Sequence, residues 1–307
     1  WWVILLAVAA TTLACGDAPL VWIADNWGRL LTCAVLVADA MAVVAYLQAV
    51  VGGRAERMTG KPLYDFFMGA ELNPRAFGGR LDMKMWSELR TSWVTLFLLT
   101  LSAAAKQRRV RGIVGDNRHI SGASWVMLVA HWLYANACQK GEESVPYTWD
   151  IFHEKWGWML IFWNIAGVPF LYCANSFFIA ERDVTLSKTT TACLFATLMS
   201  AYYVWDTSQS QRTRFRMKAQ GLYVERPWAF PVLPWGTLRS PKSMATARGY
   251  PLLISGWVGL ARKIHYTADA VMAFCWALAC VGDGGGGGGG KGGGWSPTSL
   301  MRDPLPF

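Results

Sequence analysis

Apolar segments alternate with short polar connections along most of the chain. These segments are roughly 14 to 24 residues long, against about 20 residues for a helix that crosses a bilayer. They recur at residues 1–15, 30–51, 92–105, 121–138, 157–180, 190–204 and 266–281. The pattern predicts an all-α, polytopic integral membrane protein whose helices form a multi-helix transmembrane bundle.

The composition agrees with a membrane protein. Hydrophobic residues make up 53% of the chain and charged residues only 16%, which is too apolar for an ordinary soluble enzyme. We expect residues 1–280 to form a single transmembrane domain. The first segment starts at Trp1 with neither an initiating Met nor a basic flank, so we interpret it as the remnant of a cut helix and not as a signal peptide.

Residues 281–307 have a composition unlike the rest of the chain. Their glycine runs, 284–290 and 292–294, lack the preceding strand and the following helix of a phosphate-binding loop. We interpret this region as a flexible, low-complexity tail that is either disordered or an artefact of the gene model.

The net charge of +9 is concentrated in three clusters between apolar segments. They are Arg54, Arg57 and Lys61; Lys106, Arg108, Arg109, Arg111 and Arg118; and Arg212, Arg214, Arg216 and Lys218. Basic clusters normally mark cytoplasmic loops, yet only the short segment 92–105 separates the first two. We therefore predict that this segment is re-entrant or half of a tight hairpin, and the membrane orientation stays open. The clusters suit anionic lipid or a phosphorylated cofactor.

The histidines and cysteines do not form a metal-binding pattern. His119, His131, His153 and His265 are too scattered for a zinc motif and too few for a membrane di-iron centre. We expect no metal and no nucleic acid partner, so that redox chemistry would require an organic cofactor.

Two polar segments at the borders of apolar ones carry candidate acids. The first, LYDFFMGAELNPR at 63–75, contains Asp65 and Glu71, and the second, HWLYANACQKGEE at 131–143, contains Tyr134 and Glu142. A tyrosine in a closed pocket can deliver a proton to a carbon centre. Taken alone, Tyr134 is more typical of an interfacial aromatic residue.

Two further segments carry candidate cofactor ligands. Gln209, Arg212 and Arg216 are spaced to share one helical face, while Arg214 points elsewhere. Forked cations of this kind suit a pyrophosphate or a ribose phosphate, although arginines at a helix end also snorkel toward water.

In ARKIHYTADAVMAF, at 261–274, the residues Arg262, His265 or Tyr266, and Asp269 are able to converge on one side. Asp269 enters an apolar helix, where it is either an N-terminal dipole partner or part of a polar pocket. The flanking Trp257 offers a flat surface for a nicotinamide or adenine ring.

Six motifs in this order carry a family resemblance. They are LYDFFMGAELNPR, LDMKMWSELR (81–90), KWGWMLIFWNIAGVPFLYC (155–173), WDTSQSQRTRFR (205–216), LPWGTL (233–238) and ARKIHYTAD (261–269). Together they resemble the membrane sterol reductases, which include sterol Δ14-reductases, 7-dehydrocholesterol reductase and the lamin B receptor. The resemblance covers about residues 61–280, and six motifs in sequence are more specific than any one of them.

Three features resemble the Δ24(28) (also Δ24(24¹)) sterol reductases of ergosterol biosynthesis. Relatives of the Δ14 and Δ7 branches typically carry Asn-Tyr where this chain has His265-Tyr266, and they lack the run GWMLIFWN at 157–164; the third feature is KGEE at 140–143. The resemblance implies reduction of a sterol side-chain double bond by NADPH in the endoplasmic reticulum membrane, by a multi-pass protein. The sterol would enter from the bilayer, among membrane lipid, and NADPH from the cytosol.

The resemblance also assigns roles to residues. Tyr134, Glu142, Asp65 and Glu71 would surround the reacting atoms. The resemblance puts Arg212, Arg216, Leu253, His265 and Tyr266 at cofactor-binding positions, and we add Trp257 and Asp269 from the arguments above, so that seven residues would contact the cofactor. Arg212 stands where relatives have a lysine, and Gln209, Thr213 and Val258 also depart from the family.

The largest departure from the resemblance follows Cys280, where relatives continue into segments that help to hold NADPH and this chain has its glycine runs. Either the gene model has read through an intron, which we favour, or the chain cannot close its cofactor site. The alternatives are a catalytically impaired sterol-binding protein of the same family, a Δ14 or Δ7 ring reductase, and a membrane methyltransferase that uses S-adenosylmethionine.

Overall fold

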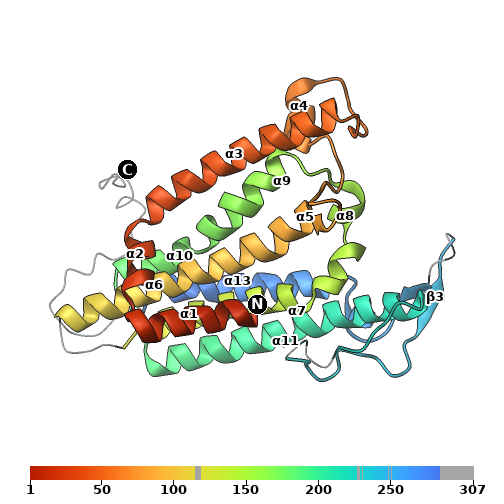
Figure 1. The fold of residues 1–307 in the computed structure, drawn as a ribbon. Coiled ribbons are helices and arrows are strands. Elements are labelled where there is room, and N and C mark those ends of the chain that lie inside the picture. Colours follow the sequence, from red (N-terminus) through yellow and green to blue (C-terminus); the bar gives the residue numbers. More distant parts are fainter. Residues whose placement is uncertain (115–118, 227–228, 230, 248, 250, 284–307) are drawn as a thin grey trace.

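The computed structural model describes residues 1–307 except 115–118, 227–228, 230, 248, 250 and 284–307. Most of the described chain is helical (Figure 1). In chain order the helices are α1 (Trp2–Cys15), α2 (Ala18–Asp25), α3 (Trp27–Val51), α4 (Pro62–Met68), α5 (Met83–Met85), the π-helix η1 (Trp86–Ser92), α6 (Trp93–Val114), α7 (Gly122–Lys140), the 3-10 helix η2 (Glu142–Tyr147), α8 (Trp149–His153), α9 (Trp158–Phe162), the π-helix η3 (Trp163–Leu171), α10 (Ala174–Glu181), α11 (Lys188–Ala219), α12 (Trp257–Leu260) and α13 (Ile264–Val281).

Two short antiparallel hairpins interrupt the helical fold, so the all-α expectation is correct only for the main body. Strands β1 (Arg75–Ala76) and β2 (Leu81–Asp82) form the first hairpin, and β3 (Ser243–Ala245) and β4 (Pro251–Leu253) form the second. The β3–β4 hairpin projects beyond the C-terminal end of α11 (Figure 1). Its strands pair Ser243 with Leu253.

Three helical segments of the described chain are long and apolar enough to cross a membrane. They are α3, the α9–α10 segment at Trp158–Glu181, and α13. A fourth span results if α1 and α2 count as one, although their axes are bent by 105°. These segments indicate a helical membrane protein with several candidate spans. The tail at 284–307, including its glycine runs, lies outside the described residues.

Helix α6 decides between the two alternatives predicted for residues 92–105. It is a continuous helix of 22 residues, about 33 Å long at 1.5 Å per residue, and so it is not a broken, re-entrant segment. It packs against α7, the next helix along the chain, as one half of a helical hairpin would. Lys106 and Arg111 lie in the last turns of this helix and not in a connection, because lysine, glutamine and arginine continue a helix readily after its apolar part ends. Arg118 lies outside the described residues.

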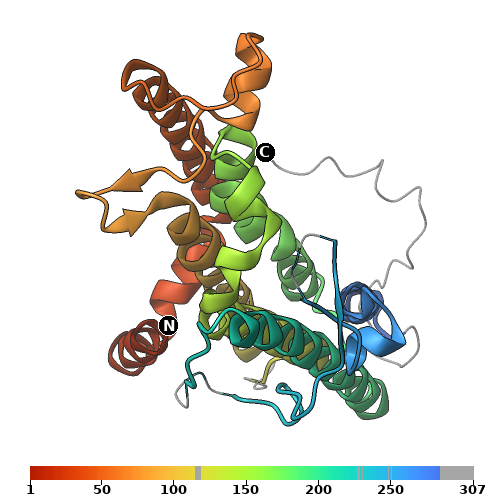
Figure 2. The same ribbon diagram turned by 90° about the vertical axis from the view of Figure 1, so that its right-hand side faces the viewer.

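Helices α7, α11 and α13 pack together and carry the candidate site. Their common core includes the buried side chains of Leu133, Leu198 and Met272. Ser121 and Ser187 cap the N-termini of α7 and α11. Each hydroxyl oxygen accepts a hydrogen bond from a backbone N–H group that has no partner within the helix. Figure 2 shows α3 and α4 on one side of the molecule and α11 and α13 on the other.

The apolar run at 157–180 is not one regular helix. It is divided into α9, η3 and α10, and η3 packs against the other π-helix, η1. Ser92 Oγ donates a hydrogen bond to the Asn164 carbonyl at 2.7 Å, and Asn164 Nδ2 donates to Ser87 Oγ at 3.2 Å. π-Helical turns are rare and often lie near functional sites.

A glycine pair fastens α4 to the start of α9. A Cβ atom on Gly157 would lie 2.1 Å from the Gly69 nitrogen, and one on Gly69 would lie 2.5 Å from the Gly157 nitrogen. The two backbones therefore touch directly. Trp158, the next residue, donates its indole N–H to Asp39 of α3 at 2.7 Å, so this contact also sets the position of α9 against α3.

We predict that Gly157→Ala lowers the stability of the protein by ~1–3 kcal/mol, because the added methyl group overpacks a rigid backbone contact. Thermal unfolding in detergent, followed by tryptophan fluorescence, measures the change. Gly28→Ala is the matched control, since a Cβ atom at Gly28 in α3 meets nothing within 4 Å. Equal melting temperatures for the two variants would contradict the prediction.

Candidate functional site

The structure brings together Tyr134 of α7 and Asp269 of α13. The Tyr134 hydroxyl donates a hydrogen bond to the Asp269 carboxylate. The tyrosine ring is enclosed by Trp93, stacked at a centroid distance of 5.5 Å, by Trp205 at 5.5 Å and by Trp276, edge-on at 5.3 Å. Asp269 therefore has a side-chain partner within an aromatic cluster.

His265 lies one turn before Asp269 on α13, and Arg212 of α11 lies beside it. Arg212 Nη1 is 3.5 Å from both ring nitrogens of His265, and the Tyr266 ring lies 4.3 Å from the His265 ring. His265 is buried, whereas Tyr266 is 60% exposed. Arg262 precedes α13 and is exposed, so the structure does not show it converging with the others.

Arg212 and Arg216 form a positive pair in the basic part of α11, beyond its apolar residues. Burial lowers the pKa of Arg212, and the neighbouring positive charge of Arg216 lowers it further. Within the described residues, neither guanidinium group has a carboxylate partner. Two adjacent cations without an acid are a suitable arrangement for holding a phosphate group.

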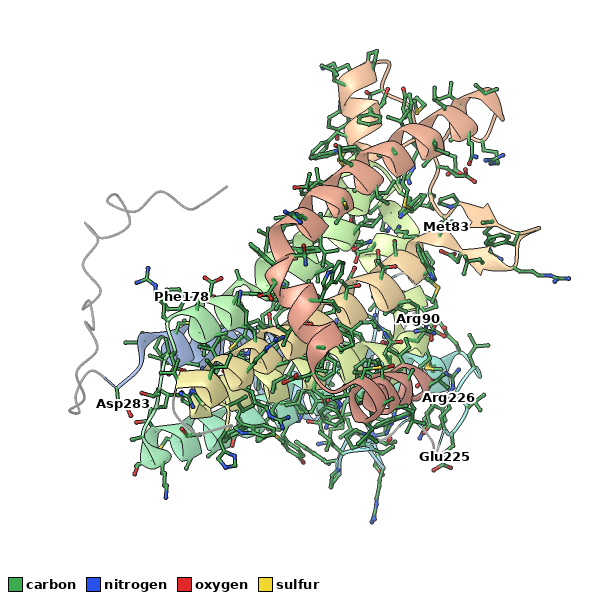
Figure 3. All side chains as sticks on the ribbon, turned by 60° about the vertical axis from the view of Figure 1, so that its left-hand side comes forward. Met83, Arg90, Phe178, Glu225, Arg226 and Asp283 are labelled. Atoms are coloured by element: carbon green, nitrogen blue, oxygen red, sulfur yellow. The ribbon has the colours of Figure 1, made fainter. Side chains whose placement is uncertain are left out.

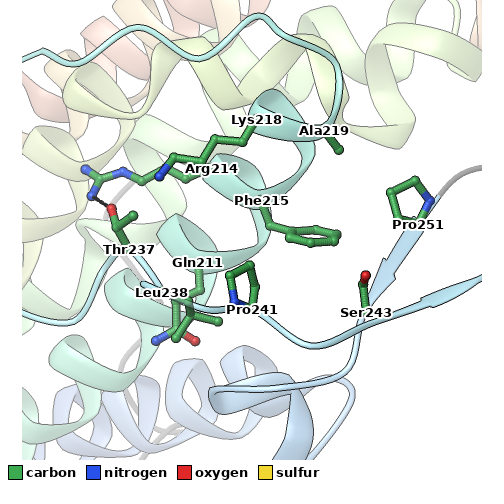
Figure 4. A pocket seen from close by; sticks show the side chains of 10 residues that line it. All are labelled: Gln211, Arg214, Phe215, Lys218, Ala219, Thr237, Leu238, Pro241, Ser243 and Pro251. Atoms are coloured by element: carbon green, nitrogen blue, oxygen red, sulfur yellow. Dashed lines mark hydrogen bonds between the residues drawn. The ribbon is translucent and has the colours of Figure 1, made fainter.

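Arg214 points away from that pair, as the spacing predicted. Its Nη1 donates to Thr237 Oγ1 at 2.6 Å and lies on the wall of a cavity of about 280 Å³ between α11 and the β3–β4 hairpin (Figure 4). Figure 4 also shows the Phe215 ring directed toward Pro251 of the hairpin. Gln209, which we expected to share a face with Arg212, lines a second cavity together with Arg214.

The second cavity has a volume of about 180 Å³ and lies between α7, η2 and α11. Lys140 and Asp206 form an ion pair of 2.6 Å on its wall, and both side chains are largely buried. Trp205, whose ring packs on Tyr134, also lines this cavity. We did not single out Lys140 or Asp206 as site residues, although both fall in motifs that carry the resemblance, and only the fold shows that they meet.

Glu142 pairs with Arg90 of η1 at 2.5 Å. Arg90 also donates to the Gln139 side chain at 2.5 Å, so the pair joins η1 to the end of α7. Arg90 and Arg226 lie at one end of the molecule, and Phe178 and Asp283 lie at the other (Figure 3). Glu142 therefore lies at the same end as Arg90, with its carboxylate committed to a cation.

The contacts of Asp65 and Glu71 are those of a structural turn. The Asp65 carboxylate accepts hydrogen bonds from the backbone N–H groups of Thr59 and Gly60, each at 3.0 Å, and the Thr59 bond is the first cause of its lowered pKa. Glu71 pairs with Arg54 at 3.1 Å. These contacts hold the connection between α3 and α4, and none of them reaches Tyr134.

Trp257 and Leu253 pack beside α11. The Trp257 indole N–H donates to Thr207 Oγ1 at 2.9 Å, its backbone N–H donates to Gln211 Oε1 at 3.0 Å, and its ring packs edge-on against Trp235. Leu253 is buried in β4. The two residues thus join the polypeptide after α11 to the helix that carries the arginine pair.

Sequence reasoning missed a buried carboxyl on η1, outside the candidate spans. One oxygen of Glu88 is buried without a hydrogen-bond partner in the described chain. Burial, followed by the charge of Asp150, raises the pKa of Glu88 to about 7, while Lys84 acts in the opposite direction. Lys84 is itself buried and donates to the backbone carbonyls of Asp150 and Glu154. The spacing of LDMKMWSELR gave no sign of this burial.

The fold and the site define a helical membrane protein with a tyrosine–carboxylate pair in an aromatic cluster and, nearby, two adjacent arginines that have no carboxylate partner among the described residues. In the part of the chain that the structure describes, no group of three or more His, Cys, Asp or Glu side chains is arranged to hold a metal. The chain belongs to the ergosterol biosynthesis ERG4/ERG24 family, which it matches over residues 1–283.

Three curated relatives illustrate the similarity. The chain is 45% identical over 278 residues to the Delta(24(24(1)))-sterol reductase of Gibberella zeae, covering 87% of this chain and 45% of the relative. It is 44% identical over 280 residues to Delta(24(24(1)))-sterol reductase erg4A of Aspergillus fumigatus, covering 90% and 58%. It is 31% identical over 255 residues to the Delta(14)-sterol reductase of Methylotuvimicrobium alcaliphilum, covering 83% and 55%. The chain thus spans about half the length of these relatives.

We predict that Glu88→Gln stabilises the protein at pH 8 by ~1–3 kcal/mol and has little effect near pH 4. A carboxyl with a raised pKa keeps a proton in the folded state that the unfolded chain has released, so the native protein loses stability as the pH rises from 4.5 to about 7. The amide never ionises and avoids this loss.

Melting temperatures of Glu88→Gln at the two pH values give the measurement. Glu225→Gln is the control, because Glu225 is exposed. A stability difference from the native protein that does not change with pH would refute the role of the buried carboxyl.

Proposed function

We propose that this protein reduces the Δ24(24¹) double bond of a sterol side chain with NADPH. The Tyr134–Asp269 pair is the observation that carries the chemistry, because it places a proton-donating group among aromatic rings. The substrate class is supported by the relatives: identity is 45% and 44% to two Delta(24(24(1)))-sterol reductases but 31% to a Delta(14)-sterol reductase.

The hydrogen bond between Tyr134 and Asp269 determines how this acid works. Since the phenol proton is donated to the carboxylate, an ionised Asp269 holds that proton back. Tyr134 becomes an effective acid when Asp269 is protonated, because the carboxyl then supplies a proton to the phenol oxygen as the phenol proton leaves. The proton donor is therefore the Tyr134–Asp269 pair in the state in which both side chains are protonated.

The aromatic cluster suits the charge that protonation creates. A proton added to the outer carbon of a side-chain alkene leaves positive charge on the inner, more substituted carbon. Trp93 and Trp205 each have one face against or near Tyr134, at 5.5 Å; an indole face turned to the reacting carbon would stabilise a cation by about 0.5–2 kcal/mol. The same rings exclude water, which would otherwise add to the carbocation.

Arg212 and Arg216 fit the phosphates of NADPH, because they are adjacent and have no acid partner in the described chain. The bound cofactor would supply a hydride to the carbocation. His265 and Tyr266 flank this pair and would line the same site. We infer that the protein is a multi-pass component of the endoplasmic reticulum membrane and takes its sterol from the bilayer, where α3 exposes apolar side chains such as Leu36 and Leu47.

Expression in yeast that lacks its own Δ24(24¹)-sterol reductase tests the function. Extracted sterols are analysed by gas chromatography and mass spectrometry, with the protein shown to be present and membrane-inserted. We expect the saturated side chain to reappear. Accumulation of the unreduced sterol would overturn the proposal, and a change in ring unsaturation instead would favour a Δ14 or Δ7 ring reductase.

We predict that Tyr134→Phe lowers kcat by about 10²–10⁴-fold, the usual contribution of a general acid, while sterol binding is retained because the ring contacts remain. Turnover and binding of a labelled sterol are measured in membranes. Tyr203→Phe is the matched control, since the Tyr203 hydroxyl donates to the Pro234 carbonyl, away from the aromatic cluster. Undiminished turnover in Tyr134→Phe would remove this residue as the proton donor.

We predict that Arg216→Ala raises the KM for NADPH by roughly 10–100-fold, which corresponds to the loss of a charge-assisted hydrogen bond, and changes kcat little. The NADPH dependence of sterol reduction in microsomes measures it. Arg80→Ala, on the exposed end of the β1–β2 hairpin, serves as the control. An unaltered NADPH dependence would return Arg216 to the role of a snorkelling side chain.

A further inference from the structure

Under the proposed function, the Tyr134–Asp269 acid must regain a proton after each turnover. Trp93, Trp205 and Trp276 surround the tyrosine ring, and within the described chain the titratable groups that interact electrostatically with Tyr134 are Asp269, Cys138 and Tyr172. A free cysteine and a tyrosine ordinarily titrate at about pH 8.5 and about pH 10, so a group on α13, the helix of Asp269, is better suited to return the proton.

His265 is such a group on α13. It precedes Asp269 by four residues, so the two side chains lie one turn apart on the same helical face, and the Asp269 carboxylate is within electrostatic range of the imidazole. His265 is only 5% exposed, but the adjacent Tyr266 is 60% exposed. The imidazole thus stands between the buried acid and the surface.

The position of Arg212 leaves the imidazole nitrogens available. Arg212 Nη1 is equally distant, at 3.5 Å, from Nδ1 and Nε2 of His265. A donor that bonds to one nitrogen along its lone pair lies closer to that nitrogen than to the other. The contact of Arg212 is therefore long and is not a well-aligned hydrogen bond to either nitrogen.

The geometry points to His265 as the residue that returns protons to the Tyr134–Asp269 acid. In this step an N–H bond of the imidazolium breaks and an O–H bond forms on Asp269, directly or through one water molecule. The imidazole then takes a proton from water at the surface, and no electrons are transferred. The groups that face His265 are the cations Arg212 and Lys263, the carboxylate Asp269 and the Tyr266 ring. The inference rests on the proposed function.

The test is the pH dependence of kcat in the His265→Asn variant. The amide retains a polar side chain of similar size but cannot carry a proton. We expect kcat to fall by about tenfold or more, and the pH dependence of the native enzyme over roughly pH 5–9 to be lost. His153→Asn on α8, whose histidine is exposed, should keep the native profile.

Two further measurements separate a proton relay from cofactor contact or misfolding. A residue that only lines the cofactor site would change the KM for NADPH and leave the pH profile of kcat intact. In His265→Ala, added imidazole should restore a substantial part of the lost turnover if the relay is correct. An unchanged kcat profile in His265→Asn, or no rescue of folded His265→Ala, would overturn the relay. A native enzyme that fails to reduce sterol would overturn the proposed function itself.

Discussion

The hydrogen bond between Tyr134 and Asp269 is the constraint on which the rest of the site depends. An aspartate in an apolar helix is costly unless it has a partner, and this one finds its partner on α7. The bond fixes α13 against α7 in rotation and in height. Trp276 is thereby brought against the tyrosine ring, and His265 is directed to the end of the helix where α11 carries its arginines.

The helices were predictable because apolar length is a strong signal for them. The predicted segments at 121–138 and 266–281 correspond closely to α7 and α13. The sequence also placed Tyr134, Asp269 and Arg212 on the correct elements. Spacing alone identified that Arg214 faces away from Arg212, and the hydrogen bond of Arg214 to Thr237 bears this out.

What the sequence could not provide were contacts between distant segments and interruptions of regular helix. Nothing in a run of apolar residues signals a π-helix, because the periodicity changes by a fraction of a residue per turn. The burial of Glu88 follows from how η1 packs and not from its own motif. The apolar run at 92–105 also underestimates the length of α6, because the helix continues past its apolar part into a basic one.

The contact between Arg212 and the His265 ring has a thermodynamic consequence. Each positive charge near this imidazole opposes the arrival of another, whether it is a guanidinium group or a proton. An anionic cofactor held by Arg212 and Arg216 would cancel part of that opposition. Cofactor and proton would then favour each other's uptake by equal amounts, as reciprocal linkage requires. The protein would then take up its proton and its reducing cofactor together, and either one alone would bind less tightly.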